Sequence, residues 1–353
     1  MAYRVGIAGA TGLVGQRLVA RLSGHPWFEL AALGASERSA GRPYREAARW
    51  ILSDPLPPEA GERLVVGCAP GDFSGCDVVL SALDATAGRL LEPALARAGL
   101  PVVSNSSAMR MDPGVPLLVP EVNAAHVDRL LSRPAAERGF VVTNPNCSVT
   151  GLAMALAPLH RAFGVRRVVV ATLQAVSGAG LDGPRAIELL DNVIPYIAGE
   201  EEKIETELRK ILGGADERGF LPAAIDVAAH CHRVNTVDGH LEAISVELDR
   251  RPSVEDVVAA LEEFTGDVRG LGLPSAPEAP IVVRREVDRP QTRLDRDAGG
   301  GMSVVVGRVR PCPVLTVRLV VLSHNTVRGA AGGALLNAEL LAARGLLGRG
   351  TGA

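Results

Sequence analysis

The sequence predicts an α/β protein with two domains, one built on a parallel sheet and the other an α+β domain with a mixed, largely antiparallel sheet. Three observations support this fold class. The 353 residues are more than one ordinary core holds. Short apolar runs alternate with helical patterns through the first half, as in βαβ units. Only 3% of the residues are aromatic, so the core must be made of Val, Leu, Ile and Ala, which suits buried parallel strands covered by helices.

The first half of the chain contains five apolar runs that we expect to be strands. The strands are expected at residues 3–9, 28–36, 76–83, 101–107 and 140–146, with helices at 13–23 and 87–99. Crossovers of this kind are right-handed and join parallel strands, so helices should cover both faces of the sheet. A further helix of small residues should begin at Cys147, just after the turn Asn144-Pro145-Asn146.

After Cys147 the pattern changes to that of the second, mixed sheet. Strands are expected in 166–180, on both sides of the Asp238-Gly239 turn in 224–248, and at 302–310 and 314–322. Helices are expected over 183–212, with interruptions at Pro195 and Gly199, over 253–266, where Ser253 is a candidate cap, and over 325–348. The last helix should pack back onto the first domain. We therefore expect a first domain of residues 1–145 and 326–353, and a second domain of residues 146–325.

Charge and apolar content argue against two classes of partner. The net charge of −3 gives no electrostatic footprint for nucleic acid or for an anionic membrane. No apolar run approaches the ~18 residues that a membrane span needs, and the first residues enter a strand without a signal-peptide pattern. The five cysteines are irregularly spaced, as expected for reduced thiols in the cytoplasm.

The stretch "VGIAGATGLVG" follows the first strand and opens the first helix. It places Gly9, Gly12 and Gly15 at three-residue spacing. Glycine lets the backbone turn tightly and approach a pyrophosphate, and the helix N-terminus offers free N–H groups and a favourable dipole. A plain tight βα turn is the alternative, but the position between strand and helix favours a dinucleotide site.

The end of the second strand indicates which dinucleotide is bound. An NAD site usually has an acid here that accepts a hydrogen bond from the ribose 2′-OH. Glu37 is present, but Ser36, Arg38 and Ser39 surround it. Hydroxyl groups and a guanidinium suit a 2′-phosphate, so we expect NADP, although Arg38 is also compatible with a solvated loop cation.

Cys147 is the thiol whose position suggests reactivity. A helix N-terminus lowers the pKa of a thiol through the dipole and nearby N–H groups, and only the thiolate is a good nucleophile. Position alone leaves two interpretations open, a nucleophile and a buried structural thiol.

The segment "HCHRVNTVDGH" offers partners for a reactive thiol. The Asp238-Gly239 turn can bring Arg233 and His240 to one pocket, and His240 is a candidate acid/base. His230 and His232 flank Cys231 but point to opposite faces of a strand, so we expect no metal site.

Three other charged residues have ordinary explanations. Glu200 and Lys203 lie three residues apart on one helical face, which by spacing alone indicates an exposed helix start. Arg110 by itself is compatible with any loop arginine.

Long, ordered motifs resemble one enzyme family from end to end. They include "GIAGATGLVGQR", "SNSSAMRMDPGVPLLVPEVN", "TNPNCSVTGL", "TLQAVSGAG", "LDNVIPYIAGEEEKIETE", "DGHLEAISVEL" and "VLSHNTVRGAAGGA". Together they resemble aspartate-β-semialdehyde dehydrogenase, in the branch found in archaea and fungi. The resemblance implies a Rossmann-type NADP domain and a catalytic and dimerisation domain, in a homodimer or homotetramer.

The resemblance also implies a role for each matching position. Cys147 would be the acylated nucleophile, His240 the acid/base, and Gln174 would orient the intermediate. Arg233 and Glu200 would bind the α-carboxylate and the amino group. Arg110, Asn146 and Lys203 would form the phosphate site. The residues implied for NADP are Gly9, Thr11, Gly12, Leu13, Val14, Ser36, Arg38 and Ser39, with Ser177, Gly178 and Asn325 near the nicotinamide.

The implied reaction is the NADPH-dependent conversion of β-aspartyl phosphate to aspartate β-semialdehyde through a thioester, at the branch point to lysine, threonine and methionine. One departure is "RVNT" at residues 233–236, where the family usually has "RVPV". Losing that Pro removes a fixed φ before the turn that carries His240, so we expect a looser strand end. The alternatives are N-acetyl-γ-glutamyl-phosphate reductase, a malonyl-CoA reductase, and a non-catalytic NADP-sensing regulator.

Overall fold

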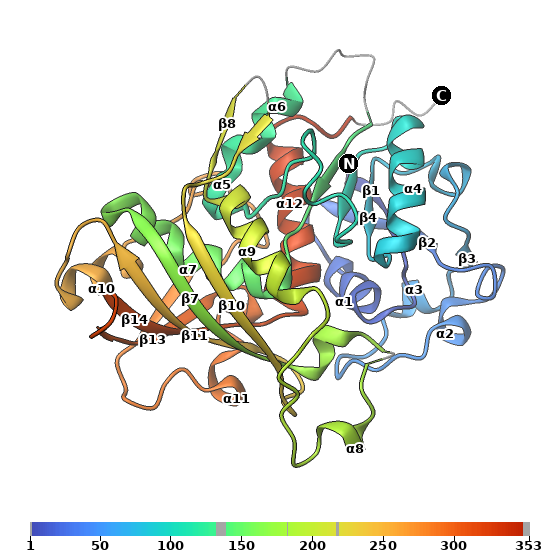
Figure 1. The fold of residues 1–353 in the computed structure, drawn as a ribbon. Helices are drawn as coiled ribbons and strands as arrows, with labels where there is room; N and C mark the ends of the chain where they lie inside the picture. The colour runs from blue at the N-terminus through green and yellow to red at the C-terminus, as the bar shows by residue number, and fades with distance from the viewer. Residues whose placement is uncertain (1, 132–138, 182, 217–218, 349–353) are drawn as a thin grey trace.

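A computed structural model describes residues 2–131, 139–181, 183–216 and 219–348. The first half forms a six-stranded parallel sheet in the order β3-β2-β1-β4-β5-β6 (Figure 1). Its strands are β1 (Tyr3–Ala8), β2 (Phe28–Gly34), β3 (Val65–Val66), β4 (Val78–Ser81), β5 (Val102–Ser104) and β6 (Val141–Thr143). This order is that of a dinucleotide-binding sheet, whose crevice lies at the carboxyl ends of β1 and β4 where the strand order reverses.

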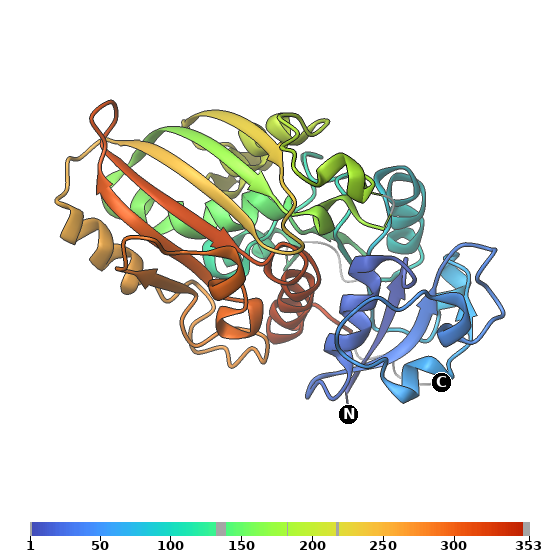
Figure 2. The ribbon, with the colours of Figure 1, turned by 90° about the horizontal axis from the view of Figure 1, so that it is seen from below.

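Helices cover both faces of this sheet, as the sequence predicts. On one face α1 (Leu13–Leu22) and α12 (Gly332–Ala343) share an apolar core with β1. On the other face α4 (Ala85–Arg97) packs, with Leu95 buried beside Val102. Shorter helices are α2 (Tyr44–Ala47), α3 (Pro58–Gly61), η1 (Pro70–Phe73), α5 (Pro120–Asn123), η2 (Ala124–Val127) and α6 (Asp128–Leu131). The helix near the C-terminus therefore returns to the first sheet, between the two halves of the molecule (Figure 2).

The second half forms a mixed six-stranded sheet in the order β10-β7-β11-β14-β13-β12. The three inner pairs are antiparallel, and the pair at each edge is parallel. The strands are β7 (Val165–Gln174), β10 (Asp226–Arg233), β11 (His240–Leu248), β12 (Ile281–Arg284), β13 (Val304–Pro311) and β14 (Val317–Ser323). A short hairpin joins β8 (Gly214–Asp216) to β9 (Gly219–Leu221).

One face of the mixed sheet is covered by α7 (Cys147–Phe163), α9 (Glu200–Ile211) and α10 (Val254–Glu262). All residues from Ser148 to Leu159 in α7 are buried, because small side chains allow packing on every side. Ser253 caps α10 by accepting the Asp256 N–H, as expected. The remaining elements are η3 (Val176–Ala179), α8 (Ala186–Leu189), α11 (Thr292–Asp295), η4 (Ala298–Gly301) and the π-helical turn η5 (Val327–Ala331).

Two expected helices differ in the structure. The helix over 183–212 is only the short α8 and then α9, since residues between them are not helical and Gly199 takes φ +68° just before α9. The expected strands on both sides of the Asp238-Gly239 turn are β10 and β11, and β7 lies between them in the sheet. The helix over 325–348 begins with a π-helical turn and ends at Ala343.

No helix among the described residues is long and apolar enough to cross a bilayer. Within the same ranges, no three His, Cys, Asp or Glu side chains gather as a metal site requires.

Candidate active site

A cavity of about 590 Å³ lies where the carboxyl ends of the first sheet meet the second half of the chain. Its lining joins loops of both halves with the first turns of α7 and α9. Twelve of the predicted site residues line it: Thr11, Gly12, Leu13, Val14, Arg110, Asn146, Cys147, Ser177, Gly178, Glu200, Lys203 and Asn325. Segments far apart in the sequence therefore meet in one space.

The glycine loop forms one wall of this cavity. Gly9 has φ +81°, and a Cβ there would lie 2.7 Å from the Ala82 carbonyl oxygen. A Cβ on Gly15 would lie 2.3 Å from the Gly9 carbonyl oxygen, so the loop and helix approach too closely for any side chain. The helix α1 has no side-chain cap at Gly12, which leaves N–H groups available for an anion. These features fit a pyrophosphate.

The predicted 2′-phosphate residues lie at the end of β2. Gly9 and Ala10 donate their N–H groups to the Gly34 carbonyl oxygen at 2.9 Å each, which ties the glycine loop to this strand end. Ser36 and Arg38 are exposed there and Ser39 is half-buried. They stand outside the cavity lining, on the side where an extended dinucleotide would continue.

Cys147 begins α7, and Asn146 caps that helix. The Asn146 Oδ1 accepts the Ser148 N–H at 2.9 Å. Gly329 of η5 passes directly beside the cysteine, since a Cβ on Gly329 would lie 2.6 Å from the Cys147 Cβ. The Cys147 Sγ lies 3.1 Å from the His240 Nε2. The structure thus brings together the thiol and the imidazole that the sequence places 93 residues apart.

The other ring nitrogen of His240 defines the tautomer. The Nδ1 accepts the Ala175 N–H at 3.0 Å, so a neutral imidazole carries its proton on Nε2, facing the sulfur. Burial, together with the positive charge of Arg233, lowers the pKa of His240 to about 3. At neutral pH the residue is an uncharged imidazole that presents an N–H donor to the reaction centre.

The pKa of Cys147 differs from the expectation based on its helix position. Part of the residue faces the cavity, yet burial, with the Glu200 carboxylate, raises the pKa of the thiol to about 12. Arg110, Arg233 and the Ser148 N–H act in the opposite direction but are outweighed. The Ser148 N–H at the helix start lowers the pKa as expected, but burial and Glu200 outweigh it, so at neutral pH the pair is a thiol and a neutral imidazole.

Glu200 lies at the centre of a buried polar cluster rather than on an exposed helix start. Its carboxylate accepts hydrogen bonds from Lys203 Nζ at 2.8 Å and Asn146 Nδ2 at 2.7 Å, and from Gln174 Nε2 at 3.4 Å. Burial opposes ionisation, but Lys203 and these donors lower the pKa of the Glu200 carboxyl. An ionised carboxylate therefore stands beside the thiol.

The two arginines are buried and held by the protein. Arg110 donates from Nη2 to the Asn105 carbonyl oxygen at 2.8 Å. Arg233 donates from Nη1 to the Ala175 carbonyl oxygen at 2.7 Å. Gly178 touches this group, since a Cβ there would lie 2.9 Å from Arg233 Nη1 and 3.1 Å from His240 Nε2. Arg233, His240 and Gln174 form the layer directly behind the cavity wall.

Asn325 connects Ser177, another predicted nicotinamide contact, to the turn that precedes His240. Its Nδ2 donates to Ser177 Oγ at 2.8 Å, and its Oδ1 accepts the Gly239 N–H at 2.8 Å. The segment before η5 and the loop after β7 are thereby held together at the cavity.

Sequence reasoning missed Glu207 and Lys210, which support the site from α9. Glu207 accepts from Arg110 Nη1 at 3.0 Å, and Lys210 Nζ donates to the Arg110 carbonyl oxygen at 2.6 Å. Their spacing from Glu200 on the same helical face was the available signal. Gly329 carried no comparable signal, because its close approach depends on the fold.

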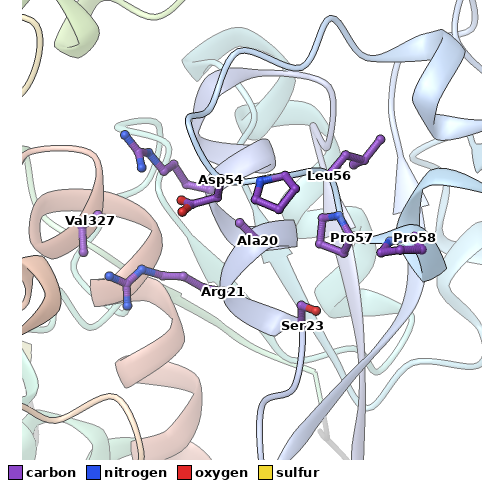
Figure 3. Close-up of a pocket in the computed structure, with 10 residues that line it drawn as sticks. Ala20, Arg21, Ser23, Asp54, Leu56, Pro57, Pro58 and Val327 are labelled. Carbon is purple, nitrogen blue, oxygen red and sulfur yellow. The ribbon is translucent and has the colours of Figure 1, made fainter.

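A second cavity of about 560 Å³ lies beside α1 (Figure 3). Arg17 and Arg21 extend from α1 there, but they bind Asp238 and the Gly300 carbonyl oxygen respectively. None of its lining residues carries a thiol or an imidazole. This cavity therefore lacks the groups for acyl transfer.

Comparison with known proteins covers nearly the whole chain. Residues 4–130 match the family model of the semialdehyde dehydrogenase NAD binding domain, and residues 156–328 that of the dimerisation domain. The aspartate-semialdehyde dehydrogenase of Methanothermobacter thermautotrophicus is 49% identical over 96% of this chain and 98% of the relative. That of Archaeoglobus fulgidus is 48% identical over 97% and 98%. A crystal structure of the Candida albicans enzyme with NADP superposes with a TM-score of 0.92 at 43% identity, covering 98% of this chain and all of that one.

Proposed function

The chain belongs to the aspartate-semialdehyde dehydrogenase family, and on that premise we propose that it reduces β-aspartyl phosphate to aspartate β-semialdehyde with NADPH, through a thioester on Cys147. One observation carries the proposal. Cys147, whose Sγ lies 3.1 Å from the His240 Nε2, lines the same cavity as the glycine loop. The reaction serves amino-acid biosynthesis, in the pathways to lysine, threonine and methionine.

The glycine loop and the β2 end are the groups that would hold NADP, which supplies the hydride. The free N–H groups at the start of α1 suit the pyrophosphate, with Thr11, Leu13 and Val14 in the wall. Ser36, Arg38 and Ser39 would bind the 2′-phosphate. Ser177, Gly178 and Asn325 line the part of the cavity next to Cys147 and would contact the nicotinamide.

Cys147 carries the acyl group in this mechanism. The sulfur attacks the acyl carbon, a C–S bond forms, the C–O bond to phosphate breaks, and the thiol proton leaves with the phosphate. The phosphate leaves toward Arg110, Lys203 and Asn146, whose positive charges and amide donor suit an anion. Splitting the reaction through a thioester divides one high barrier into two lower ones.

His240 and Gln174 act on the oxygen of the bound intermediate. The Nε2–H of His240 faces the sulfur, so it can donate to an oxygen that develops negative charge on the neighbouring carbon. A hydride on the thioester carbon, which NADPH would supply, and a proton on its oxygen give a thiohemiacetal. Collapse of this intermediate breaks the C–S bond, returns the proton to the sulfur and releases the aldehyde. The buried Gln174 amide, which bonds to Glu200, would orient this intermediate.

Glu200 and Arg233 favour a substrate with a free amino acid end. The ionised Glu200 carboxylate suits a positively charged amine, and Arg233 suits a carboxylate. An N-acetylated amine carries no charge and gains nothing from a buried carboxylate. The buried Glu200 therefore argues against N-acetyl-γ-glutamyl-phosphate reductase activity.

Parallel assays of β-aspartyl phosphate, N-acetylglutamyl phosphate and malonyl-CoA with NADPH test the proposal. We expect turnover of β-aspartyl phosphate and little of the other two. Faster turnover of either alternative would replace the proposed substrate. NADP binding without turnover of any of the three would indicate the non-catalytic regulator.

We propose that two copies associate through the uncovered face of the mixed sheet, in a homodimer that can pair into a tetramer. Val169 is 46% and Leu173 37% exposed on this face, and the matching family model is named for dimerisation. Light scattering of the purified protein tests the association; a monomer at micromolar concentration contradicts it.

We also propose the domain boundaries given above, 1–145 with 326–353 and 146–325. We propose that the protein acts in the cytoplasm, where the five free cysteines stay reduced.

A further inference from the structure

We propose that Glu207 is a positioning residue for the phosphate end of the site, holding Arg110 and the backbone beside Cys147 as one unit. The inference rests on the proposed function, because it assigns Glu207 to the phosphate step of that reaction. Glu207 lies on α9, about one turn beyond Lys203, and does not line the cavity. It therefore acts through the residues that do.

The two oxygens of the Glu207 carboxylate bind two different segments. Oε1 accepts from Arg110 Nη1 at 3.0 Å, and Oε2 accepts the backbone N–H of Asn146 at 2.6 Å. The Glu207 side chain is 2% exposed and that of Arg110 9%. Removing one partner of such a buried, charge-assisted pair leaves the other charge buried and uncompensated, which is strongly destabilising. Glu207 thus joins the guanidinium of the phosphate site to the cap of the nucleophile's helix.

Lys210 holds the same arginine from its main-chain side. Its Nζ donates to the carbonyl oxygens of Arg110, Asp112 and Val115 at 2.6, 3.0 and 2.8 Å. Because Lys210 and Glu207 are neighbours on one face of α9, a single rigid helix grips both the backbone and the guanidinium of Arg110. The same face carries Glu200, which holds Asn146 by its side chain at 2.7 Å.

Only a carboxylate satisfies both partners. A glutamine at this position has one acceptor and one NH₂ donor, so either the Arg110 guanidinium or the Asn146 N–H would face a donor. Arg110 would then be free to change its angle relative to the thiol. Phosphate binding should therefore weaken, because Arg110 would bind the phosphate. Binding of the semialdehyde and of NADP should not change, because they have other contacts.

The test compares Glu207→Gln with Glu202→Gln, which makes the same chemical change on an exposed position of α9. Rates are measured in the oxidative direction, with aspartate semialdehyde, NADP and inorganic phosphate. For Glu207→Gln we expect the KM for phosphate to rise roughly 10- to 100-fold, as for loss of a charged hydrogen bond, with the other two KM values within about twofold. Glu202→Gln should match the wild type.

Two outcomes overturn the inference. An unchanged KM for phosphate shows that Glu207 does not position the site, and a parallel rise of all three KM values shows a merely structural role. Glu207→Asp serves if the glutamine variant does not fold: it keeps the charge but is one methylene too short for both partners, and it should also raise the KM for phosphate alone.

Failure of the proposed function is recognised separately. If the wild-type protein shows no phosphate-dependent turnover, calorimetric titration with inorganic phosphate replaces the kinetic assay. Weaker phosphate binding by Glu207→Gln than by Glu202→Gln then supports the positioning role, and equal binding by the two variants overturns it.

Discussion

The two walls of the cavity are built in different ways. The dinucleotide wall is a short, continuous stretch whose backbone N–H groups and glycines would bind the pyrophosphate. The acyl wall collects charged and polar side chains from the start of α7, from α9 and from the segment around Arg110, most of them buried, with Arg233 of β10 directly behind them. A wall of backbone groups depends little on any one side chain. A wall of mutually paired buried charges depends on every member.

Replacing the nucleophile should give the largest difference between the walls. In Cys147→Ser the hydroxyl is a far weaker nucleophile, so we expect turnover to fall by roughly 10⁴-fold or more. The affinity for NADP, measured by calorimetry, should stay within about twofold, since the glycine wall is untouched. Cys312→Ser, in a half-buried loop remote from the cavity lining, is the matched control and should keep full activity. Substantial turnover by Cys147→Ser would rule out the thioester.

Breaking a buried ion pair beside the acyl wall should have the second-largest effect, on the stability of the fold. Arg328 of η5 donates from both Nη groups to Glu121, at 2.7 and 2.6 Å, and both side chains are 1% exposed. Arg328→Met leaves an uncompensated buried carboxylate and should lower the free energy of unfolding by about 3–5 kcal/mol.

The control for this prediction is Arg45→Met, which breaks an exposed pair with Glu62 near the dinucleotide side. It should cost less than about 1 kcal/mol in the free energy of unfolding. Urea denaturation measures both variants. Equal losses in the free energy of unfolding for the two variants would contradict the claim that only the acyl side depends on its paired charges.

The two thiols Cys147 and Cys312 offer a pH test of the same contrast. Burial and Glu200 raise the pKa of Cys147 to about 12. Partial burial works against ionisation of Cys312, but the N–H groups of Leu315 and Val314 outweigh it and lower the pKa of that thiol. At neutral pH, without ligands, we expect iodoacetamide to alkylate Cys147 at least ~100-fold more slowly than Cys312.

The sign of the pH dependence follows from the same pKa values. Below a raised pKa the thiolate is scarce, so the alkylation rate of Cys147 should rise about tenfold per pH unit from neutral to alkaline pH without a plateau. The rate at Cys312 should level off at lower pH. Peptide mass spectrometry follows both sites, and an early plateau at Cys147 would show that the helix N-terminus outweighs burial.

The contrast also explains which parts the sequence could predict. The glycine loop, the first-half strands and the helix start at Cys147 depend on residues close in the chain, and spacing revealed them. Helical spacing alone predicts an exposed Glu200, because spacing says nothing about what covers a face of the helix. The role of Glu207 cannot be predicted from the sequence for the same reason, since its partners Arg110 and Asn146 belong to distant segments.

The raised pKa of Cys147 cannot be predicted from the sequence for a related reason. The helix N-terminus is a local feature visible in sequence, whereas burial and the Glu200 carboxylate come from tertiary packing. The Asp238-Gly239 turn likewise left the pairing of its strands undetermined. In the structure β7 inserts between β10 and β11, which is a property of the whole sheet.

Arg38 should give the smallest effect, on the exposed edge of the dinucleotide wall. In Arg38→Ala we expect the KM for NADP to rise about tenfold, because one charged contact to the 2′-phosphate is lost in a solvent-screened position. The KM for NAD should stay within about twofold, and kcat should not change. Arg42→Ala, another arginine exposed on the same loop, is the control and should leave both KM values unaltered. The effect of Arg38→Ala should shrink at high salt, since screening already weakens an exposed contact. If instead Arg38→Ala lowers kcat or raises the KM for NAD as much as that for NADP, this edge is coupled to the buried charges after all, and the independence of the two walls fails.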